Sequence, residues 1–153
     1  MQIRTHKRED QAAIIDLHNI GLDQTGAHKG PGPWDDDLQN IENVYDKNNG
    51  AFLVGELNGK IIAMGALRRI SDAAAEIKRM RVLPAFQRQG FGQAMLTALE
   101  DEARGKKYVT LHLDTSVSQV AAQTLYLQNG YVETKRIMDG SREVIFYEKH
   151  IEL

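Results

Sequence analysis

The amino-acid sequence predicts an α/β (α+β) fold with about seven strands and about four helices. The chain has 153 residues and is 42% hydrophobic, which suits one core of ordinary size. Apolar residues alternate with period two in several short runs and recur with helical spacing in others. The runs follow the order β-α-α-β-β-β-α-β-α-β-β, and we expect residues 1–153 to form a single domain.

Composition excludes several kinds of site. The chain has no cysteine, so it forms no disulfide, has no cysteine nucleophile and offers no thiolate to a metal. Its five histidines show no metal-ligand spacing, so we predict no metal site. The net charge of −2 gives no general case for binding nucleic acid.

Hydropathy predicts neither a membrane span nor a signal peptide. No apolar run approaches the roughly 20 residues of a spanning helix. Residues 1–8 lack the apolar core of a signal peptide. The simplest expectation is a cytoplasmic protein with no membrane partner and no nucleic-acid partner.

The N-terminal residues predict a strand followed by a helix. Residues 2–6 can form a short strand, and the helix opens at residues 8–10. One face of this helix comprises Ala13, Ile14, Leu17 and His18.

A loop and a second helix follow. Residues 21–34 contain four glycines and two prolines, which predicts a loop. The second helix is expected to begin at residues 35–37, where three aspartates suit the positive end of the helix dipole. Its apolar face comprises Leu38, Ile41 and Tyr45.

Two strands then form a hairpin. Residues 51–57 and 60–69 flank Asn58-Gly59, which is the strongest short hairpin signal because both residues tolerate a positive φ. Residues 61–67 are apolar on both faces, as expected for a strand in the middle of a sheet.

The next strand, residues 75–82, changes phase along its length. Its apolar positions are first odd-numbered, at Ala75 and Ile77, and then even-numbered, at Met80 and Val82. Because strand side chains alternate, both pairs face one core only if the strand gains a residue between them. We therefore predict a β-bulge near residues 78–80, which would free backbone groups there to bind an extended ligand.

The bulged strand leads into a glycine-containing loop and a third helix. Gly90 and Gly92 carry no Cβ to keep a ligand from the backbone. The helix brings unpaired N–H groups and the positive end of its dipole, which predicts an anion site suited to a pyrophosphate. The alternative is a plain strand-to-helix turn. The apolar face comprises Phe91, Ala94, Met95, Ala98 and Leu99, and the opposite face comprises Gln93, Thr97, Glu100 and Asp101.

The C-terminal part predicts a strand, a helix and a closing strand pair. The strand covers residues 108–114, where apolar and polar residues alternate, and the helix covers residues 118–129. Residues 131–138 and 143–149 form an antiparallel pair around a turn at Asp139-Gly140.

Two motifs carry a family resemblance. The stretch Val82-x-Pro84-x-x-Gln87-Arg88-Gln89-Gly90-x-Gly92 resembles the acyl-CoA signature of the GCN5-related N-acetyltransferase (GNAT) family. Downstream, Ala122-x-x-Leu125-Tyr126-Leu127-Gln128-Asn129-Gly130-Tyr131 is similar to a second motif of that family. The resemblance implies a GNAT-like acyl-CoA N-acyltransferase fold: a mixed, mostly antiparallel sheet with one parallel strand pair that splays where the cofactor enters.

The resemblance also implies that acetyl-CoA is the acyl donor. Its pantetheine arm would pair with the backbone at residues 80–82, and its pyrophosphate would lie on the N–H groups of residues 88–92. Arg88 would add a charge-assisted bond, the alternative being a solvated surface charge. Where the family often has asparagine, this chain has Gln119, whose longer amide would make that contact. The implied cofactor-binding residues are Met80, Arg81, Val82, Gln87, Arg88, Gln89, Gly90, Phe91, Gly92 and Gln119.

Tyr126 and Glu76 are the implied catalytic residues. Tyr126 matches the family's tyrosine that protonates the CoA thiolate; the alternative is a core tyrosine that only packs or donates a hydrogen bond to the sulfur. Glu76 lies where some members place a catalytic base; the alternative is a strand carboxylate paired with a neighbour such as Arg68 or Lys78. His112 and Asp114 are weaker alternatives for the base. A backbone N–H in the bulged strand near Met80 would bind the oxyanion.

The resemblance implies that the acceptor binds mainly at the first two helices, their connecting loop and the last hairpin. His28 and Trp34 are the implied acceptor-binding residues, and the aspartates at 35–37 beside an aromatic wall would suit a cationic amine. The alternative is a helix cap and a half-buried tryptophan. The sequence leaves a polyamine, an amino acid, an aminoglycoside and a protein N-terminus equally open.

The leading hypothesis is therefore an acetyl-CoA-dependent N-acetyltransferase acting on a primary amine of a small molecule or peptide. The alternative is a non-catalytic acyl-CoA-binding sensor or regulatory module. A P-loop nucleotide-binding protein is disfavoured, because no Gly-Lys-Ser/Thr follows the glycines. A homodimer is expected only as a habit of the family.

Overall fold

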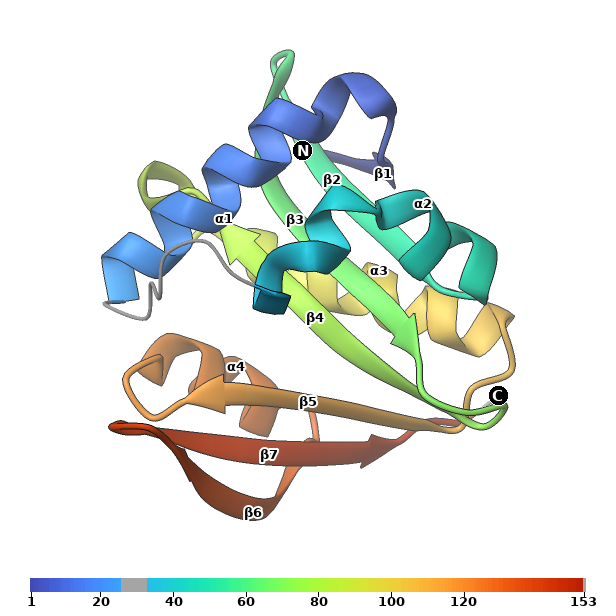
Figure 1. Ribbon diagram of the computed structural model, residues 1–153, viewed down its shortest axis with the longest axis vertical. Coiled ribbons are helices and arrows are strands. Elements are labelled where there is room, and N and C mark those ends of the chain that lie inside the picture. Colours follow the sequence, from blue (N-terminus) through green and yellow to red (C-terminus); the bar gives the residue numbers. More distant parts are fainter. Residues whose placement is uncertain (26–32, 153) are drawn as a thin grey trace.

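The protein is built on one twisted seven-stranded sheet (Figure 1). The computed structural model describes residues 1–25 and 33–152, and it leaves out the side chains of residues 22–25 and 33–35. Neighbouring strands are antiparallel except for the parallel pair β4–β5, and the order is β1-β2-β3-β4-β5-β7-β6. The strands are β1 (Gln2–Thr5), β2 (Ala51–Leu57), β3 (Lys60–Arg69), β4 (Ala74–Val82), β5 (Thr110–Ser116), β6 (Val132–Asp139) and β7 (Arg142–His150).

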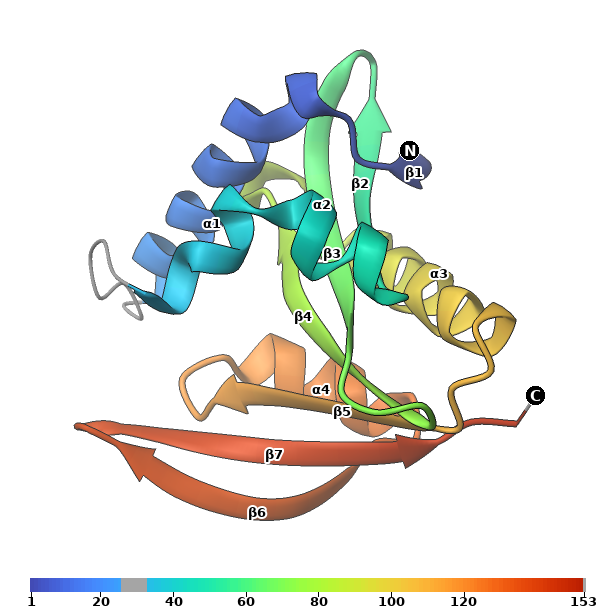
Figure 2. The same ribbon diagram turned by 45° about the vertical axis from the view of Figure 1, so that its right-hand side comes forward.

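Helices cover both faces of this sheet (Figures 1 and 2). The α-helices are α1 (Gln11–Thr25), α2 (Ile41–Val44), α3 (Phe91–Gly105) and α4 (Val120–Gln128). The 3-10 helices are η1 (Arg8–Asp10), η2 (Pro33–Gln39), η3 (Asp46–Asn48) and η4 (Pro84–Phe86). The mixed, mostly antiparallel sheet with its flanking helices confirms the predicted fold class. None of the described helices is long and apolar enough to cross a membrane.

Two apolar clusters fill the space between the helices and the sheet. One contains Met95 and Leu99 of α3, and the other contains Ile14 and Leu17 of α1. Strand β3 contributes to both clusters, with Leu67 in the first and Met64 in the second. This confirms that β3 is buried on both faces, as its continuous run of apolar residues predicted.

The predicted loop over residues 21–34 is wrong at both described ends. Helix α1 continues through Gly21 to Thr25, and residues 33 and 34 belong to η2. A glycine costs about 1 kcal/mol relative to alanine inside a helix, and tertiary packing overrides this cost. A Cβ on Gly21 would lie 2.4 Å from Cδ of Arg81, so the glycine gives the Arg81 side chain room against α1.

The predicted second helix is divided into η2, α2 and η3. Its predicted face is nevertheless correct, since Leu38, Ile41 and Tyr45 are all buried. Packing against the sheet therefore selects the same three side chains although the helical geometry changes along the segment.

The predicted face of α3 needs a correction. Ala94 is exposed, whereas Glu100, which the helical spacing placed on the outer face, is buried. The Glu100 carboxylate accepts a hydrogen bond from the Tyr131 hydroxyl at 2.8 Å and lies 2.9 Å from Nζ of Lys149. These partners from the C-terminal part of the chain compensate the burial of its charge.

The predicted β-bulge is confirmed in β4. Ala66 pairs with Lys78 and Met64 pairs with Arg81, so β4 advances by one residue more than β3. Arg79, inside the bulge, has a φ of 58°. This left-handed conformation costs a side-chain-bearing residue roughly 1–2 kcal/mol.

The parallel pair β4–β5 is short and then opens (Figure 2). Only residues 74–76 of β4 pair with residues 110–112 of β5. Residues 77–82 lie along β3 on one side, and on the other side no strand of the described residues pairs with them. The sheet thus has an internal strand edge, as the family resemblance predicted.

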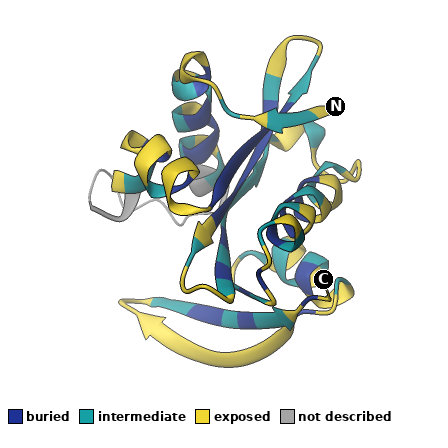
Figure 3. Ribbon diagram, turned by 90° about the vertical axis from the view of Figure 1, so that its right-hand side faces the viewer, coloured by how far each residue is buried: buried dark blue, intermediate teal, exposed yellow. Residues whose placement is uncertain are grey.

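The closing strand pair is also confirmed, around a turn at Gly140 with a φ of 66°. The strand β6 lies at the edge of the sheet and is exposed along its whole length (Figure 3). No described helix therefore packs over β6.

Candidate functional site

The internal edge of β4 lies beside the N-terminus of α3 and the middle of α4. Gly92 marks the place where the three elements meet. A Cβ on Gly92 would lie 3.7 Å from Cδ2 of Leu125 on α4 and 4.0 Å from Cγ2 of Val82 on β4. Since these are ordinary van der Waals distances, the packing of the protein itself does not require a glycine here.

The loop before α3 presents backbone donors. Arg88 and Gly90 have φ values of 63° and 85°, so the chain turns twice through the left-handed region before the helix begins. The N–H groups of residues 88–92 donate to no oxygen atom of the described residues, and no side chain caps the helix. Unpaired donors at the positive end of a fifteen-residue helix form the kind of anion site that the sequence predicted.

Two of the implied cofactor residues shape this loop. The Gln87 amide donates to the carbonyl of Val82 at 3.0 Å, and the Gln89 amide donates to the carbonyl of Ala85 at 3.4 Å. Gln87 therefore connects the loop to the end of β4. The side chain of Arg88 is exposed to solvent.

The predicted catalytic tyrosine is buried behind the open strand edge. The ring of Tyr126 packs against the rings of Tyr131 and Tyr147, with centroids 5.9 and 6.1 Å apart. Burial raises the pKa of Tyr126 to about 12; the charge of Arg81 opposes this shift and that of Asp114 adds to it. The Tyr126 hydroxyl therefore stays protonated, and able to donate, at ordinary pH.

Glu76 lines a hollow on the sheet face that α1 and α2 leave open. The hollow has a volume of about 280 Å³ and is lined by residues of four neighbouring strands. Its lining comprises Glu76, His112, Leu113, Asp114, Thr134, Lys135, Phe146, Tyr147 and Glu148. Glu76, His112 and Glu148 lie opposite one another on β4, β5 and β7, so they form a row across the floor of the hollow.

The surroundings of Glu76 in the hollow raise the pKa of its carboxyl group. Burial raises its pKa; the cation of Lys78 opposes this, and the charge of Asp114 raises the pKa further. Arg68 lies opposite Glu76 in the β3–β4 pair, yet no ion pair joins Glu76 to any described residue. A half-buried, unpaired carboxylate with a raised pKa is a typical feature of a functional site.

Gln119 has a structural contact of its own. Its Oε1 accepts hydrogen bonds from the Thr115 hydroxyl at 2.6 Å and from the Ser116 backbone N–H at 3.2 Å. The side-chain oxygen therefore fixes the turn between β5 and α4. The amide nitrogen is the part of Gln119 that remains for a ligand.

The implied acceptor residues cannot be placed in the same way. Trp34 lies in η2, but its side chain is outside the description, and His28 lies outside the described residues. Asp37, from the predicted acidic cluster, binds the guanidinium of Arg79 and accepts a hydrogen bond from the Tyr45 hydroxyl. Burial raises the pKa of Asp37, but the bonds from Arg79 and Tyr45 outweigh this and hold it below its ordinary value.

Arg79 is a residue whose importance the sequence did not indicate. The phase change in β4 predicts where the bulge lies, but it contains no signal for the partner of a bulge side chain. Gly21 carried a signal that could have been used, because a glycine within a helical run often marks a close approach of another group.

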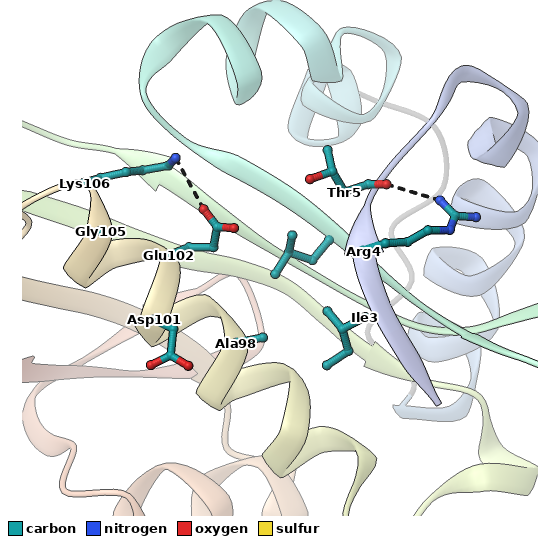
Figure 4. Close-up of a pocket in the computed structure, with 9 residues that line it drawn as sticks. Ile3, Arg4, Thr5, Ala98, Asp101, Glu102, Gly105 and Lys106 are labelled. Carbon is teal, nitrogen blue, oxygen red and sulfur yellow. Dashed lines mark hydrogen bonds and ion pairs between the residues drawn. The ribbon is translucent and has the colours of Figure 1, made fainter.

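A second hollow lies away from these residues. It has a volume of about 640 Å³ and lies between the edge strand β1 and helix α3 (Figure 4). Its charged residues have partners of their own: Lys106 pairs with Glu102 at 3.3 Å, and Arg4 pairs with Asp10 at 2.8 Å. None of the residues predicted to form the site lines it. Within the part of the chain that the structure describes, no cluster of potential ligands could hold a metal ion.

Comparison with known sequences identifies the family. The family model described as "Acetyltransferase (GNAT) family" matches residues 14–131. A "[Ribosomal protein bS18]-alanine N-acetyltransferase" of Escherichia coli (strain K12) is 37% identical over 104 residues, which cover 66% of this chain and 66% of that protein. The chain spans between 47% and 66% of the length of the curated relatives that it matches first.

Solved structures share the whole fold. An acetyltransferase from Streptococcus agalactiae 2603 superposes with a TM-score of 0.89 at 22% identity, over 98% of each chain. A putative acetyltransferase from Salmonella typhimurium, solved with its cofactor acetyl-CoA, superposes with a TM-score of 0.84 at 23% identity. This match covers 100% of the present chain and 95% of the other. At sequence identities of 22% and 23%, the similarity to these two structures supports the fold alone.

Proposed function

The chain belongs to the acetyltransferase (GNAT) family, and on this basis we propose that it transfers the acetyl group of acetyl-CoA directly to a primary amine of a small molecule or a peptide. The observation that carries the proposal is the open edge of β4 beside the unpaired N–H groups of residues 88–92. One surface thereby offers a strand edge for a peptide-like arm and an anion site for a pyrophosphate.

The residues present fit acetyl-CoA. The backbone at Met80, Arg81 and Val82 borders the open edge and suits the pantetheine arm. The N–H groups of residues 88–92, with the charge of Arg88, suit the pyrophosphate. Gly92 leaves its backbone open to a ligand although no protein neighbour demands a glycine there. The contact proposed for Gln119 falls to its amide nitrogen, since its oxygen is bonded within the protein.

The transfer requires one proton to leave the amine and one to reach the sulfur. The amine nitrogen forms a bond to the thioester carbon, and the carbon–sulfur bond then breaks. Glu76 takes the proton of the amine, directly or through water, and its raised pKa makes it a stronger base than an ordinary carboxylate. A backbone N–H near Met80 stabilises the oxyanion.

Tyr126 serves the departing sulfur. A phenol with a pKa of about 12 is a weaker acid than a thiol with a pKa near 8.5, so complete transfer of its proton to the thiolate is unfavourable. This supports the role of a hydrogen-bond donor that stabilises and orients the thiolate, which then takes a proton from solvent.

Release of free thiol from acetyl-CoA tests the function. The chain has no cysteine, so a thiol reagent detects CoA with almost no background from the protein. The acceptor panel should contain polyamines, amino acids, aminoglycosides and peptides, including peptides with N-terminal alanine because of the bS18-alanine relative. Release with one class of amine is the expected result and identifies the acceptor class. Tight CoA binding without release would favour the acyl-CoA sensor, and no binding would contradict both.

A further inference from the structure

The side chain of Arg79, in the bulge of β4, is anchored on the other side of the site. Its Nε lies 3.0 Å from Oδ2 of Asp37, and its Nη2 lies 2.5 Å from Oδ1. The two side chains are only 11% and 9% exposed. The Tyr45 hydroxyl donates a hydrogen bond to the same carboxylate. One carboxylate on η2 thus connects the bulge to the end of α2.

The backbone at Arg79 needs such an anchor. Its left-handed φ of 58° is disfavoured for a residue with a side chain, so surrounding contacts have to maintain it. A two-point arginine–carboxylate pair fixes direction as well as distance, and a nearly buried pair has little freedom to rearrange. The geometry of the bulge therefore depends on a contact 42 residues away in the sequence.

The two ends of this contact belong to different halves of the proposed site. Arg79 is followed by residues 80–82, whose backbone is proposed to hold the acyl donor. Asp37 belongs to η2, the element that also contains Trp34. Burial raises the pKa of Asp114 in the hollow, and the charges of Lys78, Arg142 and Arg79 oppose this rise, so Arg79 lies near the hollow. The pair therefore spans from the donor strand to the acceptor side.

We infer that the Asp37–Arg79 pair is a positioning device, which holds η2 against the bulge of β4 so that the acyl donor and the acceptor amine meet in a fixed geometry. The inference rests on the proposed function for the identity of the two ligands. Asp37 and Arg79 act through the backbone of residues 80–82 and are positioning residues. The aspartate run at 35–37 accordingly contributes at least one carboxylate to structure rather than to binding an amine.

A second arginine–carboxylate pair in the chain serves as a control, although its arginine, Arg4, also binds Glu56 through Nε at 3.0 Å. Arg4 and Asp10 also form a two-point pair, with Nη1–Oδ2 and Nη2–Oδ1 distances of 2.8 and 3.0 Å. Their side chains are 19% and 6% exposed. This pair joins β1 to η1 at the far edge of the sheet, away from the hollow and from the loop before α3.

The experiment compares Asp37→Asn with Asp10→Asn. Both substitutions remove one carboxylate charge from a nearly buried arginine, so both should lower the thermal midpoint. Only Asp37→Asn should speed the hydrogen exchange of residues 77–82 and weaken CoA binding in calorimetry. We expect it also to lower kcat at least about tenfold, because small misplacements of reacting groups are costly. Asp10→Asn should leave CoA affinity and kcat at the wild-type values.

Two double variants keep the test decisive if a single substitution prevents folding. Asp37→Asn/Arg79→Gln and Asp10→Asn/Arg4→Gln each replace a charged pair with two amides and leave no buried guanidinium without its partner. Equal hydrogen exchange of residues 77–82 and equal CoA affinity in these two double variants would overturn the inference. A wild-type protein that binds CoA but releases no thiol would refute the proposed function alone, since exchange and CoA affinity would still decide the role of the pair.

Discussion

Burial acts on the two proposed catalytic side chains with different chemical results. Tyr126 loses its contact with water among other aromatic rings, so the neutral phenol is favoured and remains a donor. Glu76 is partly withdrawn from water in the hollow, so its protonated form is favoured and its carboxylate becomes a stronger base. In both cases the residue type supplies the group, and the surrounding side chains determine its proton affinity.

Replacing Tyr126 tests the donor at the sulfur. We expect Tyr126→Phe to lower kcat at least about tenfold with little change in the acceptor KM, because only the hydroxyl is removed. Tyr108→Phe is the control, since Tyr108 is also fully buried and its hydroxyl donates to the carbonyl of Asn49 at 2.7 Å, outside the site. Steady-state kinetics of both variants decide the point; an unchanged kcat in Tyr126→Phe would remove Tyr126 from the reaction.

Replacing Glu76 tests the base. As pH falls through the raised pKa of Glu76, the carboxylate is protonated and kcat/KM should fall, with the midpoint above the ordinary value for glutamate. Glu76→Gln should lower kcat/KM about 100-fold near neutral pH and abolish this acid limb. Glu42→Gln, at an exposed position on α2, should leave the pH profile unchanged. If the limb persists in Glu76→Gln, the base is another group.

The substitution Glu76→Gln should lower activity but raise the stability of the fold at high pH. Because the folded-state pKa of Glu76 is raised, its ionisation opposes folding. The stabilisation from the protonated Glu76 side chain is fully present below the unfolded-state pKa, about 4.3, and is lost as pH rises through the folded-state pKa. Glu76→Gln should therefore raise the thermal midpoint at pH 8 and leave it nearly unchanged at pH 3. A lower midpoint at pH 8 would show that Glu76 stabilises the fold through contacts instead.

At the level of elements, the two glycines at the start of α3, Gly90 and Gly92, differ in their backbone conformation and surroundings. Helix α3 begins after Gly90, whose φ of 85° lets the chain enter the helix without a side-chain cap. Gly92 lies inside the first turn and faces α4 and β4 without touching either closely. The backbone thus explains the first glycine, whereas no contact within the protein explains the second, which we propose leaves room for the ligand.

Gly92→Ala separates these two explanations. The new methyl group fits the protein, so the variant should be as stable as the wild type or up to about 1 kcal/mol more stable, from its higher helix propensity. We expect it to weaken CoA binding at least about tenfold, because the methyl group occupies the approach to the backbone. Gly105→Ala, at the other end of α3 with open space around its Cβ, is the matched control. Equal CoA affinity in the two variants, measured by calorimetry, would refute the pyrophosphate site.

At the scale of the whole molecule, backbone pairing in the sheet is weakest between β4 and β5, although one apolar cluster runs across this junction from Leu53 on β2 to Tyr147 on β7. Helices α1 and α2 cover the N-terminal strands, whereas β6 and β7 extend beyond them (Figure 1). Only three residue pairs join β4 to β5, so few backbone bonds connect the two strands. The acyl donor is proposed to bind along the open strand edge and the acceptor amine beside Glu76 in the hollow, so both proposed positions lie around this junction.

A ligand that bridges this junction should stabilise the whole chain. With CoA at about 100 times its Kd, linkage adds about 2.7 kcal/mol, which should raise the thermal midpoint by about 5–10 °C. Scanning calorimetry at increasing CoA concentration measures the shift, and adenosine, which lacks the pyrophosphate and the pantetheine arm, provides the comparison. A midpoint that does not move with CoA would contradict binding at the junction.

Local patterns in the amino-acid sequence predict the order of elements, the hairpin at Asn58-Gly59, the bulge near Arg79 and the two family motifs. Periodicity and turn chemistry act between residues that are close in the chain, so these features can be derived from local patterns. Even the splayed pair β4–β5 followed from the motifs, since the resemblance extends to the fold.

The use of particular side chains depends on contacts that form when the chain folds. Tertiary packing keeps Gly21 inside a helix beside Arg81, buries Glu100 against Tyr131 and Lys149, and joins Asp37 to Arg79. It also brings Glu76, His112 and Glu148 into one hollow. Each of these outcomes depends on a partner from a distant part of the chain, because burial makes an unpaired charge or an occupied space costly. Such partners are set by the packing of the sheet and its helices, and no local pattern contains them.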